Sequence, residues 1–315
     1  MKILTIGAAV VDIVVARVLP MRGAKQDVAH IGLYAGGGAV NAALNFAARG
    51  AQATVQAGVG ADLEGGLIAG LLARHGVHVA FETVSEPTGK AVVMVDERGA
   101  ARAYAQRGAS ARVGGHGFPG LAACDVAYVT GLSLESQAHL DAALSAPGGR
   151  GWRLVVTPGA RQIAQPEALR ILRREADLLC MNIDEASRLC GEAPAAAHEE
   201  FPPERAEALA RRILSREGQG VLITLGEGGA LFHDGRAGHF APAQAVEVVS
   251  TVGAGDAYAS AFVHEWAQGA DPARALTEAA ASAARILQVL PANLAGALRE
   301  VSQESPGSLS PGNRS

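Results

Sequence analysis

Cysteine is scarce in this chain of 315 residues, which contains only three of them. Cys124, Cys180 and Cys190 are odd in number and show no Cys-x-x-Cys spacing. Disulfide-stabilised secreted domains carry more cysteines, and metal-binding modules carry them at closer spacing. The nine histidines are scattered and include no His-Glu-x-x-His motif, so no zinc site is indicated. We therefore expect a reduced compartment, the cytoplasm.

Long apolar runs and long basic runs are also missing. No apolar run reaches the roughly 18 residues that span a bilayer, and Asp12 interrupts the apolar N-terminal segment. We expect that segment to form a buried strand rather than a signal peptide. No run of Lys and Arg reaches five residues, and the net charge is −4. The sequence thus argues against two kinds of partner, membranes and nucleic acids.

Two common phosphate-binding motifs are absent as well. The glycines at 36–38 are not followed by the Gly-Lys-Ser/Thr of a Walker A loop. No Gly-x-Gly-x-x-Gly follows the first apolar segment. A P-loop nucleotidase and a Rossmann dehydrogenase are therefore disfavoured.

The apolar residues make up 49% of the chain against 18% charged residues, which is enough for a large core. Strand-like segments alternate with helical ones, and this predicts an α/β fold with a mostly parallel central sheet flanked by helices. The strand-like segments include residues 2–6, 54–59, 77–84, 126–130, 154–157, 178–181 and 220–225. We expect one domain over 1–301 and a disordered tail at 302–315, which is rich in Ser, Pro and Gly.

Two regions interrupt this alternation. The segments within 13–33 and 88–106 have the composition of additional strands, and the second contains a hairpin turn at 97–100. We predict that both contribute to a small β-sheet that covers the strand ends as a lid.

The stretch 250–262 carries the clearest candidate for chemistry. Gly253 and Gly255 precede Asp256 where a loop turns into a helix. The first N–H groups of a helix lack intrahelical partners and the helix dipole makes that end positive, so a phosphate can bind there. Asp256 would then stand beside the phosphate and could accept a proton. The alternative is an acid that only complements the dipole, beside glycines that only form a turn.

Polar residues near the strand ends are candidates for binding hydroxyl groups. Asp12 comes shortly after the first strand, and ligands gather at the carboxyl ends of parallel strands. Gly36, Gly37 and Asn41, where a helix begins, would suit a polyol that approaches the backbone closely. Plain turns would explain the same residues.

Asn182 and Glu185 stand three residues apart where another helix begins, so both face one side of its first turn. An amide and a carboxylate in this arrangement could hold the water shell of Mg²⁺. The alternative is a capping box, in which the two residues bind each other's backbone N–H groups.

Taken together, these motifs and their order resemble the ribokinase-like, or PfkB, carbohydrate kinases, over roughly residues 2–290. The motifs in chain order are Gly36-Gly37-x-Ala39-x-Asn41, Thr88-Gly89-x-Ala91 with Val95-Asp96, Asn182-x-x-Glu185, Thr224-Leu225-Gly226-x-x-Gly229 and Thr251-x-Gly253-Ala254-Gly255-Asp256. Each is short, but five motifs in the family's order are specific.

The resemblance implies a ribokinase-like fold and an ATP- and Mg²⁺-dependent kinase with Asp256 as its general base. The anion hole that it implies consists of Gly253, Ala254 and Gly255. The substrate-binding residues that it implies are Asp12, Gly36, Gly37, Asn41 and Glu135. The nucleotide-binding residues that it implies are Asn182, Thr224, Gly226 and Gly229, with Asn182 and Glu185 also organising the metal. A homodimer formed through the lid would be typical of the family.

The chain departs from the family at Ser250, where an Asp that helps to bind a monovalent cation is usual. We therefore expect weak dependence on potassium. The substrate that we expect is a small sugar of the ribose or fructose class with a free primary hydroxyl. A nucleoside kinase of the same fold is an alternative that Tyr34 and Tyr104 leave open. A catalytically silent sugar sensor is another, but Gly255 and Asp256 are both present.

Overall fold

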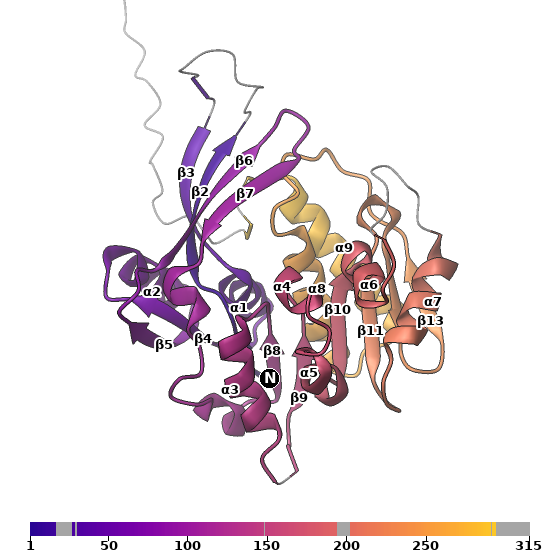
Figure 1. The fold of residues 1–315 in the computed structure, drawn as a ribbon. Helices are drawn as coiled ribbons and strands as arrows, with labels where there is room; N and C mark the ends of the chain where they lie inside the picture. The colour runs from indigo at the N-terminus through magenta and orange to yellow at the C-terminus, as the bar shows by residue number, and fades with distance from the viewer. Residues whose placement is uncertain (17–26, 29, 148, 194–201, 291, 294–315) are drawn as a thin grey trace, which may run out of the picture.

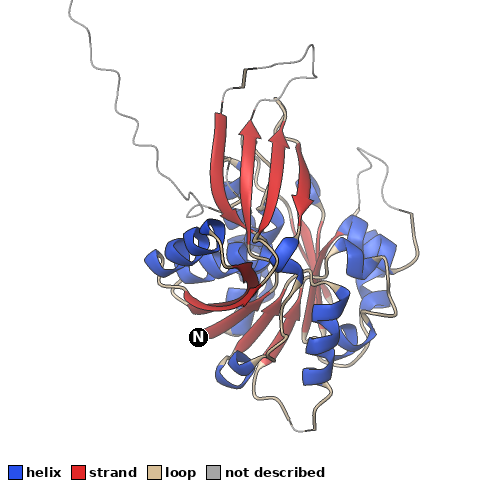
Figure 2. Cartoon of the chain, turned by 60° about the vertical axis from the view of Figure 1, so that its left-hand side comes forward, coloured by secondary structure: helices blue, strands red, loops and turns tan. Residues whose placement is uncertain are grey.

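The computed structural model describes residues 1–16, 27–28, 30–147, 149–193, 202–290 and 292–293. In this part of the chain the strands form two sheets, a large one in the body of the molecule and a small one that projects from it (Figure 1, Figure 2). The tail predicted at 302–315 lies outside the described residues.

The large sheet contains nine strands within the described residues, in the order β13-β12-β11-β10-β9-β8-β1-β4-β5. They are β1 (Lys2–Ile6), β4 (Gln52–Gly60), β5 (His78–Val84), β8 (Val126–Val129), β9 (Arg153–Val156), β10 (Leu178–Asn182), β11 (Gly220–Thr224), β12 (Ala230–His233) and β13 (Gly238–Ala241). The strands from β5 to β11 pair in parallel, and β12 and β13 extend one edge in antiparallel orientation. The predicted, mostly parallel central sheet is confirmed.

Helices cover both faces of this sheet, which explains the unbroken apolar character of its central strands. Ile3 packs into one core and its neighbour Leu4 into the other. The first core lies against α1 (Gly38–Ala48), α2 (Leu63–Arg74), α8 (Ala254–Ala267) and α9 (Pro272–Leu287). The second lies against α3 (Leu134–Leu144), α4 (Ala160–Ile163), α5 (Arg170–Glu175), α6 (Ile183–Leu189) and α7 (Pro203–Ile213). Short 3-10 turns are η1 (Gly108–Ala111), η2 (Pro119–Ala123) and η3 (Gly226–Gly228).

Among the described residues, none of the helices has both the length and the apolar character that crossing a bilayer would require.

The small sheet has the order β3-β2-β6-β7. Its strands are β2 (Val10–Ala16), β3 (His30–Gly36), β6 (Gly89–Val95) and β7 (Ala101–Gln106). The predicted lid is confirmed as a separate sheet, but β2 begins at Val10 rather than at residue 13. Only three residues separate β1 from β2, so the chain enters the lid before it reaches Asp12. Asp12 therefore lies inside a strand of the lid and not in a loop after β1.

The two faces of the lid differ in what they contact. Val14 belongs to the buried face. On the opposite face Leu33, Ile13, Val92 and Tyr104 are in register across all four strands. Three of these four, Leu33, Val92 and Tyr104, are exposed. We refer to Leu33, Ile13, Val92 and Tyr104 as the outer lid row.

The lid is tied to the body at its base and at its tip. At the base, Asp62 caps α2 by accepting a hydrogen bond from the Gly65 N–H (2.9 Å). Its carboxylate also accepts bonds from the Thr88 N–H (2.7 Å) and hydroxyl (2.5 Å), just before β6. At the tip of the β6–β7 hairpin, the Gly99 carbonyl accepts a bond from the Thr251 N–H (3.1 Å). The hairpin tip thus contacts the loop that leads into α8.

Candidate active site

The start of α8 has the features that an anion site requires. Gly253 precedes the helix with a left-handed φ of 78°, and a Cβ there would come within 2.1 Å of the Ala292 carbonyl oxygen. Only glycine fits this position. A Cβ at Gly255, in contrast, would have no atom within 4 Å, so the space above Gly255 is open. The first N–H groups of α8 therefore face a space that a phosphate could enter.

Asp256 lies in the first turn of α8. Its Oδ2 accepts a hydrogen bond from Asn41 Nδ2 (2.9 Å), and Asn41 Oδ1 accepts one from Asn293 Nδ2 (2.8 Å). The side chain is partly open to the cavity described next. Burial of the carboxyl group raises the pKa of Asp256, and the hydrogen bond from Asn41 lowers it. A carboxylate held this way could accept a proton from a ligand in the cavity.

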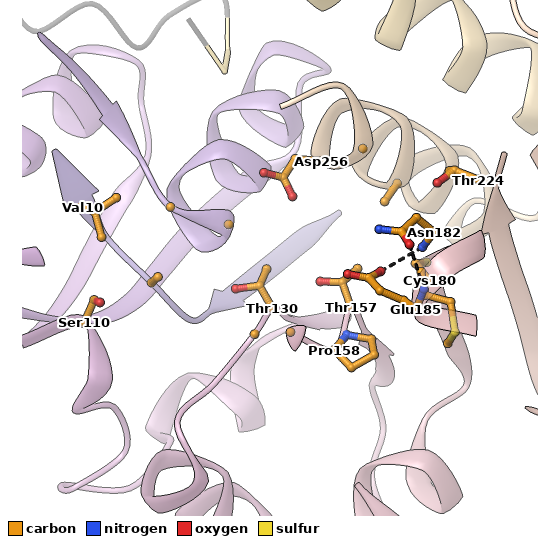
Figure 3. A pocket seen from close by; sticks show the side chains of 18 of the residues that line it. Val10, Ser110, Thr130, Thr157, Pro158, Cys180, Asn182, Glu185, Thr224 and Asp256 are labelled. Carbon is orange, nitrogen blue, oxygen red and sulfur yellow. Dashed lines mark hydrogen bonds between the residues drawn. The ribbon is translucent and has the colours of Figure 1, made fainter. Parts of the chain in front are cut away.

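A cavity of about 450 Å³ lies between the lid, the start of α1 and the strand ends (Figure 3). Its lining includes six of the predicted site residues: Gly37, Asn182, Glu185, Thr224, Gly255 and Asp256. Backbone at Gly37 and Gly38 and hydroxyls at Thr130 and Thr157 complete the floor. This mixture of bare backbone and hydroxyl groups suits a polar ligand of sugar size.

Asp12 and Gly36 lie against each other in the lid, next to this cavity but not in its lining. Asp12 shares a face of β2 with Val10, which lines the cavity. A Cβ at Gly36 would fall 1.8 Å from Asp12 Oδ2, so glycine makes room for the carboxylate. Burial, and then the charge of Asp256, raise the pKa of Asp12 to about 7. The structure thus brings Asp12 and Asp256, two predicted site residues, into the same electrostatic environment.

Glu135 is the predicted substrate residue that the structure does not bring to the cavity. It lies in the first turn of α3 and forms an ion pair with Arg112, which also pairs with Glu86 at 3.0 Å. The Glu135 side chain is 56% exposed. The end of β8 contributes Thr130 to the cavity instead, and the connection that follows carries Glu135 away from it.

A second cavity of about 730 Å³ adjoins the first. The predicted nucleotide residues Thr224, Gly226 and Gly229 line it, and so do apolar side chains of α8 and α9 such as Leu287. Thr224 and Gly255 line both cavities. The start of α8 therefore lies at the junction where a group could pass from a ligand in one cavity to a ligand in the other.

Asn182 and Glu185 form a capping box and line the first cavity at the same time. The Asn182 N–H donates to Glu185 Oε2, and the Glu185 N–H donates to Asn182 Oδ1, both at 2.9 Å. The second carboxylate oxygen of Glu185 stays available for a ligand. No group of three or more His, Cys, Asp or Glu gathers among the described residues. A single carboxylate suits Mg²⁺ that keeps its waters and contacts phosphates, so these residues fit a nucleotide-bound magnesium ion.

Sequence reasoning missed three residues at the site. Asn293 is buried and lies 252 positions from Asn41, which it orients. Arg107 lines the first cavity and Arg98 the second. Both arginines belong to the lid region, where no motif marks them. Only the pairing of β6 with β7 brings these positions toward the cavities.

Residues 1–294 match a family whose description is pfkB family carbohydrate kinase. Fructoselysine 6-kinase of Shigella flexneri is 33% identical over 89 residues, which cover 27% of this chain and 34% of the relative. Its counterpart from Escherichia coli is 32% identical over 78 residues, 25% of this chain and 30% of the relative. The matches to these curated relatives thus span about a third of their length.

Solved structures share the fold over nearly the whole chain. Ribokinase of Thermotoga maritima superposes with a TM-score of 0.75 at 22% identity, covering 94% of this chain and 95% of that one. Phosphofructokinase-2 of Escherichia coli also has a TM-score of 0.75 at 22% identity, covering 91% and 93%. These likenesses show the fold. The chain belongs to the pfkB family of carbohydrate kinases.

Proposed function

We propose that this protein transfers the γ-phosphate of ATP to a primary hydroxyl of a small sugar of the ribose or fructose class. The observation that carries the proposal is the position of Gly255 and Asp256. Gly255 lines both cavities, and Asp256 projects into the smaller one from the first turn of the same helix. A sugar in the smaller cavity and ATP in the larger one would meet at this point.

The reaction needs one group that accepts a proton and several hydrogen-bond donors that stabilise the negative charge on the phosphoryl group. Asp256 accepts the proton of the attacking hydroxyl, and that oxygen forms the new bond to the γ-phosphorus while the bond to ADP breaks. The backbone N–H groups at the start of α8 stabilise the charge on the phosphoryl oxygens, each contributing roughly 3 kcal/mol by analogy with oxyanion holes. The lid keeps water away, so that the phosphate goes to the sugar.

Asn182 and Glu185 would hold the magnesium ion through its waters at the phosphate side of the cavity (Figure 3). The ion would supply positive charge against the phosphate oxygens. Related structures support ATP as the donor, because ribokinase of Cryptococcus neoformans was solved with ADP and that of Arabidopsis thaliana with ribose and ATP.

A sugar is favoured over a nucleoside by the lid residues that line the smaller cavity. Among the described residues they include Val10 and Ala105 and no aromatic ring. Tyr34 lies on the same face of the lid as Asp12 but packs against the cluster around Val14 and does not line the cavity. Tyr104 belongs to the outer lid row and is 57% exposed, so it offers no stacking surface to a base. Gly255 and Asp256 are both in place, which favours an enzyme over a silent sensor.

The experiment is a panel of pentoses, ketohexoses, fructoselysine, sugar acids and nucleosides, each incubated with ATP and Mg²⁺ and scored for release of ADP. We expect turnover with at least one sugar and none with nucleosides. Turnover with nucleosides alone would show that the sugar assignment is wrong.

We also propose a homodimer in which the outer lid rows of two copies pack together. The row is apolar and continuous across four strands. A two-fold axis would place the outer lid row of one subunit against the same row of the other, so both subunits would use the same surface.

A further inference from the structure

A chain of hydrogen bonds leads to Asp256 from a residue that lines neither cavity. Asn293 is buried, and its Nδ2 donates to the backbone carbonyl of Ala35 in β3 (3.2 Å) and to Asn41 Oδ1 on α1 (2.8 Å). Asn41 Nδ2 donates in turn to Asp256 Oδ2 on α8 (2.9 Å). One buried amide therefore joins a lid strand to α1 and, through Asn41, to the helix that carries the proposed base.

The direction of this chain is set at the end remote from Asp256. A backbone carbonyl only accepts hydrogen bonds, so the side-chain group of Asn293 that faces Ala35 has to be its NH2 group. The second hydrogen of that group goes to Asn41, which must therefore present its oxygen to Asn293. The Asn41 NH2 group is then the part that faces Asp256. One carbonyl that cannot donate thus determines how two amides and a carboxylate are arranged.

The protonation state of Asp256 depends on which end of the Asn41 amide it meets. An NH2 group stabilises a carboxylate, whereas an amide oxygen would stabilise the protonated acid by accepting a bond from its O–H. Rotation of the Asn41 amide by half a turn would exchange the two groups. The same rotation would turn its NH2 group toward the NH2 group of Asn293, so that two donors would face each other. Asn293 therefore opposes the rotation that would favour a protonated Asp256.

The surroundings of Asp256 make this orientation important. Burial raises the pKa of Asp256, and the bond from Asn41 lowers it. Burial, followed by the charge of Asp256, raises the pKa of two carboxyl groups near it, Asp12 on β2 and Glu185 on α6. Burial also raises the pKa of the phenol of Tyr128 on β8, which is therefore neutral. The Asn41 bond thus works against both the burial of Asp256 and the repulsion from neighbouring acids.

We propose that Asn293 is a positioning residue for Asp256: it keeps the oxygen of Asn41 occupied, so that this amide presents its NH2 group and holds the base in its ionised form. Asn293 acts through Asn41 and needs no contact with the sugar or with ATP. The proposal rests on the proposed function, because it takes Asp256 as the base of the transfer.

The test replaces Asn293 by leucine, which has nearly the same size and no donor. The matched control is Asn45→Leu, one turn further along α1 than Asn41, where the side-chain nitrogen is buried without a hydrogen-bond partner in the described part of the chain. Each variant is made in the wild type and in Asp256→Asn. Should leucine prevent folding, Asn293→Asp keeps the shape, and its carboxylate would attract the Asn41 NH2 group away from Asp256, with Asn45→Asp as the control for the added charge.

Three quantities are measured on each protein. The first is kcat as a function of pH, with a sugar that the panel identifies. The second is the titration of the Asp256 carboxyl group by carbon NMR of aspartate-labelled protein, which needs no sugar. The signals of Asp256 and Asp12 are assigned by their loss in Asp256→Asn and Asp12→Asn. The third is the melting temperature.

We expect Asn293→Leu to raise the pKa of Asp256 by about half a unit to one unit, which corresponds to one neutral hydrogen bond. Below this pKa kcat should fall by roughly threefold to tenfold, and at alkaline pH it should return to the wild-type value with the sugar KM nearly unchanged. In Asp256→Asn the substitution should lower the melting temperature but not kcat, because its effect on kcat passes through Asp256. Asn45→Leu should leave kcat and the titration unchanged.

An equal loss of kcat at every pH, or the same loss with and without the Asp256 carboxylate, would overturn the inference and leave Asn293 with a structural role. An unchanged titration of Asp256 would do the same. A raised pKa of Asp256 in a protein that phosphorylates no sugar of the panel would uphold the role of Asn293 and contradict the kinase proposal.

Discussion

The orientation of the Asn41 amide is fixed by its two neighbours. Asn293 Nδ2 donates to Ala35 O (3.2 Å) and to Asn41 Oδ1 (2.8 Å). The oxygen of the Asn41 amide is therefore occupied, and its nitrogen has to point to the Asp256 carboxylate. This arrangement favours the ionised form of Asp256 and leaves its other oxygen for the sugar hydroxyl.

Asp256→Asn should keep the fold and sugar binding but lose turnover. Asn has almost the same shape, and its oxygen can still accept the bond from Asn41. It cannot accept a proton, and general-base catalysis contributes about 10²–10⁴-fold. We expect kcat to fall by that factor with little change in sugar affinity or melting temperature, measured on the same preparation. A variant that keeps more than about a tenth of wild-type kcat would remove Asp256 from the mechanism.

Asp12→Asn should stabilise the protein increasingly as the pH rises. The folded-state pKa of Asp12 is raised from 3.8 to about 7, so folding favours its protonated form. The stability that this form provides is lost as the pH rises through the folded pKa, at about 1.4 kcal/mol per pKa unit. Asn carries no charge and avoids the loss. Melting temperatures of both proteins between pH 5 and 8.5 should diverge up to about pH 7 and then run parallel; a constant difference would contradict this assignment.

At the scale of the element, the two glycines at the start of α8 have different tasks. Gly253→Ala places a methyl group on a left-handed residue and against the Ala292 carbonyl, so we expect a lower melting temperature. Gly255→Ala meets no protein atom and should leave the melting temperature unchanged. Its methyl group would instead occupy the space of the phosphate and lower kcat/KM by about 10²-fold, the value of a lost charge-stabilising contact. Normal activity of Gly255→Ala would show that the phosphate does not approach this residue.

The loop before α8 also bears on the cation requirement. Ser250 is completely buried, and its hydroxyl oxygen accepts a hydrogen bond from the Val252 N–H (3.2 Å). A neutral oxygen that is already occupied attracts a cation less than a free carboxylate does. We expect similar rates in potassium chloride and in the chloride of a bulky organic cation at equal ionic strength. Activation by potassium of about tenfold, or 1.4 kcal/mol in the transition state, would refute this.

At the scale of the whole molecule, the proposed dimer depends on the outer lid row. Leu33→Lys introduces a charge into this row at a residue that is 46% exposed, so the monomer should fold normally. The control is Leu63→Lys, which changes a 69% exposed leucine at the start of α2. In sedimentation velocity we expect a dimer for the wild type and the control, and a monomer for Leu33→Lys. A monomeric wild type would exclude the dimer, and a dimeric Leu33→Lys would place its interface elsewhere.

The sequence predicted the parts of this molecule that depend on local patterns. The apolar strands, the glycines at the starts of α1 and α8, and the lid hairpin are each marked by a short sequence pattern. The structure contains each of these elements near the predicted residues. Asn293 could not be predicted, because its role depends on a contact 252 positions away. Glu135 was predicted as a substrate residue only through the resemblance to the family, and its pairing with Arg112 is a tertiary contact without a local signal. The sequence left two interpretations open for Asn182 and Glu185, a capping box and a pair that binds the hydrated metal. In the structure the two residues form the capping box and also line the first cavity.

The bond between the hairpin tip and the loop before α8 has a thermodynamic consequence. Thr251 lines the larger cavity and donates its N–H to Gly99 at the end of the lid. A sugar that holds the lid in this position also holds the wall of the neighbouring cavity. Such coupling is reciprocal, so the factor by which a bound sugar raises the affinity for ATP equals the factor by which ATP raises the affinity for the sugar. We expect release of the two products to be linked in the same way, because one contact joins the hairpin to the wall of the larger cavity.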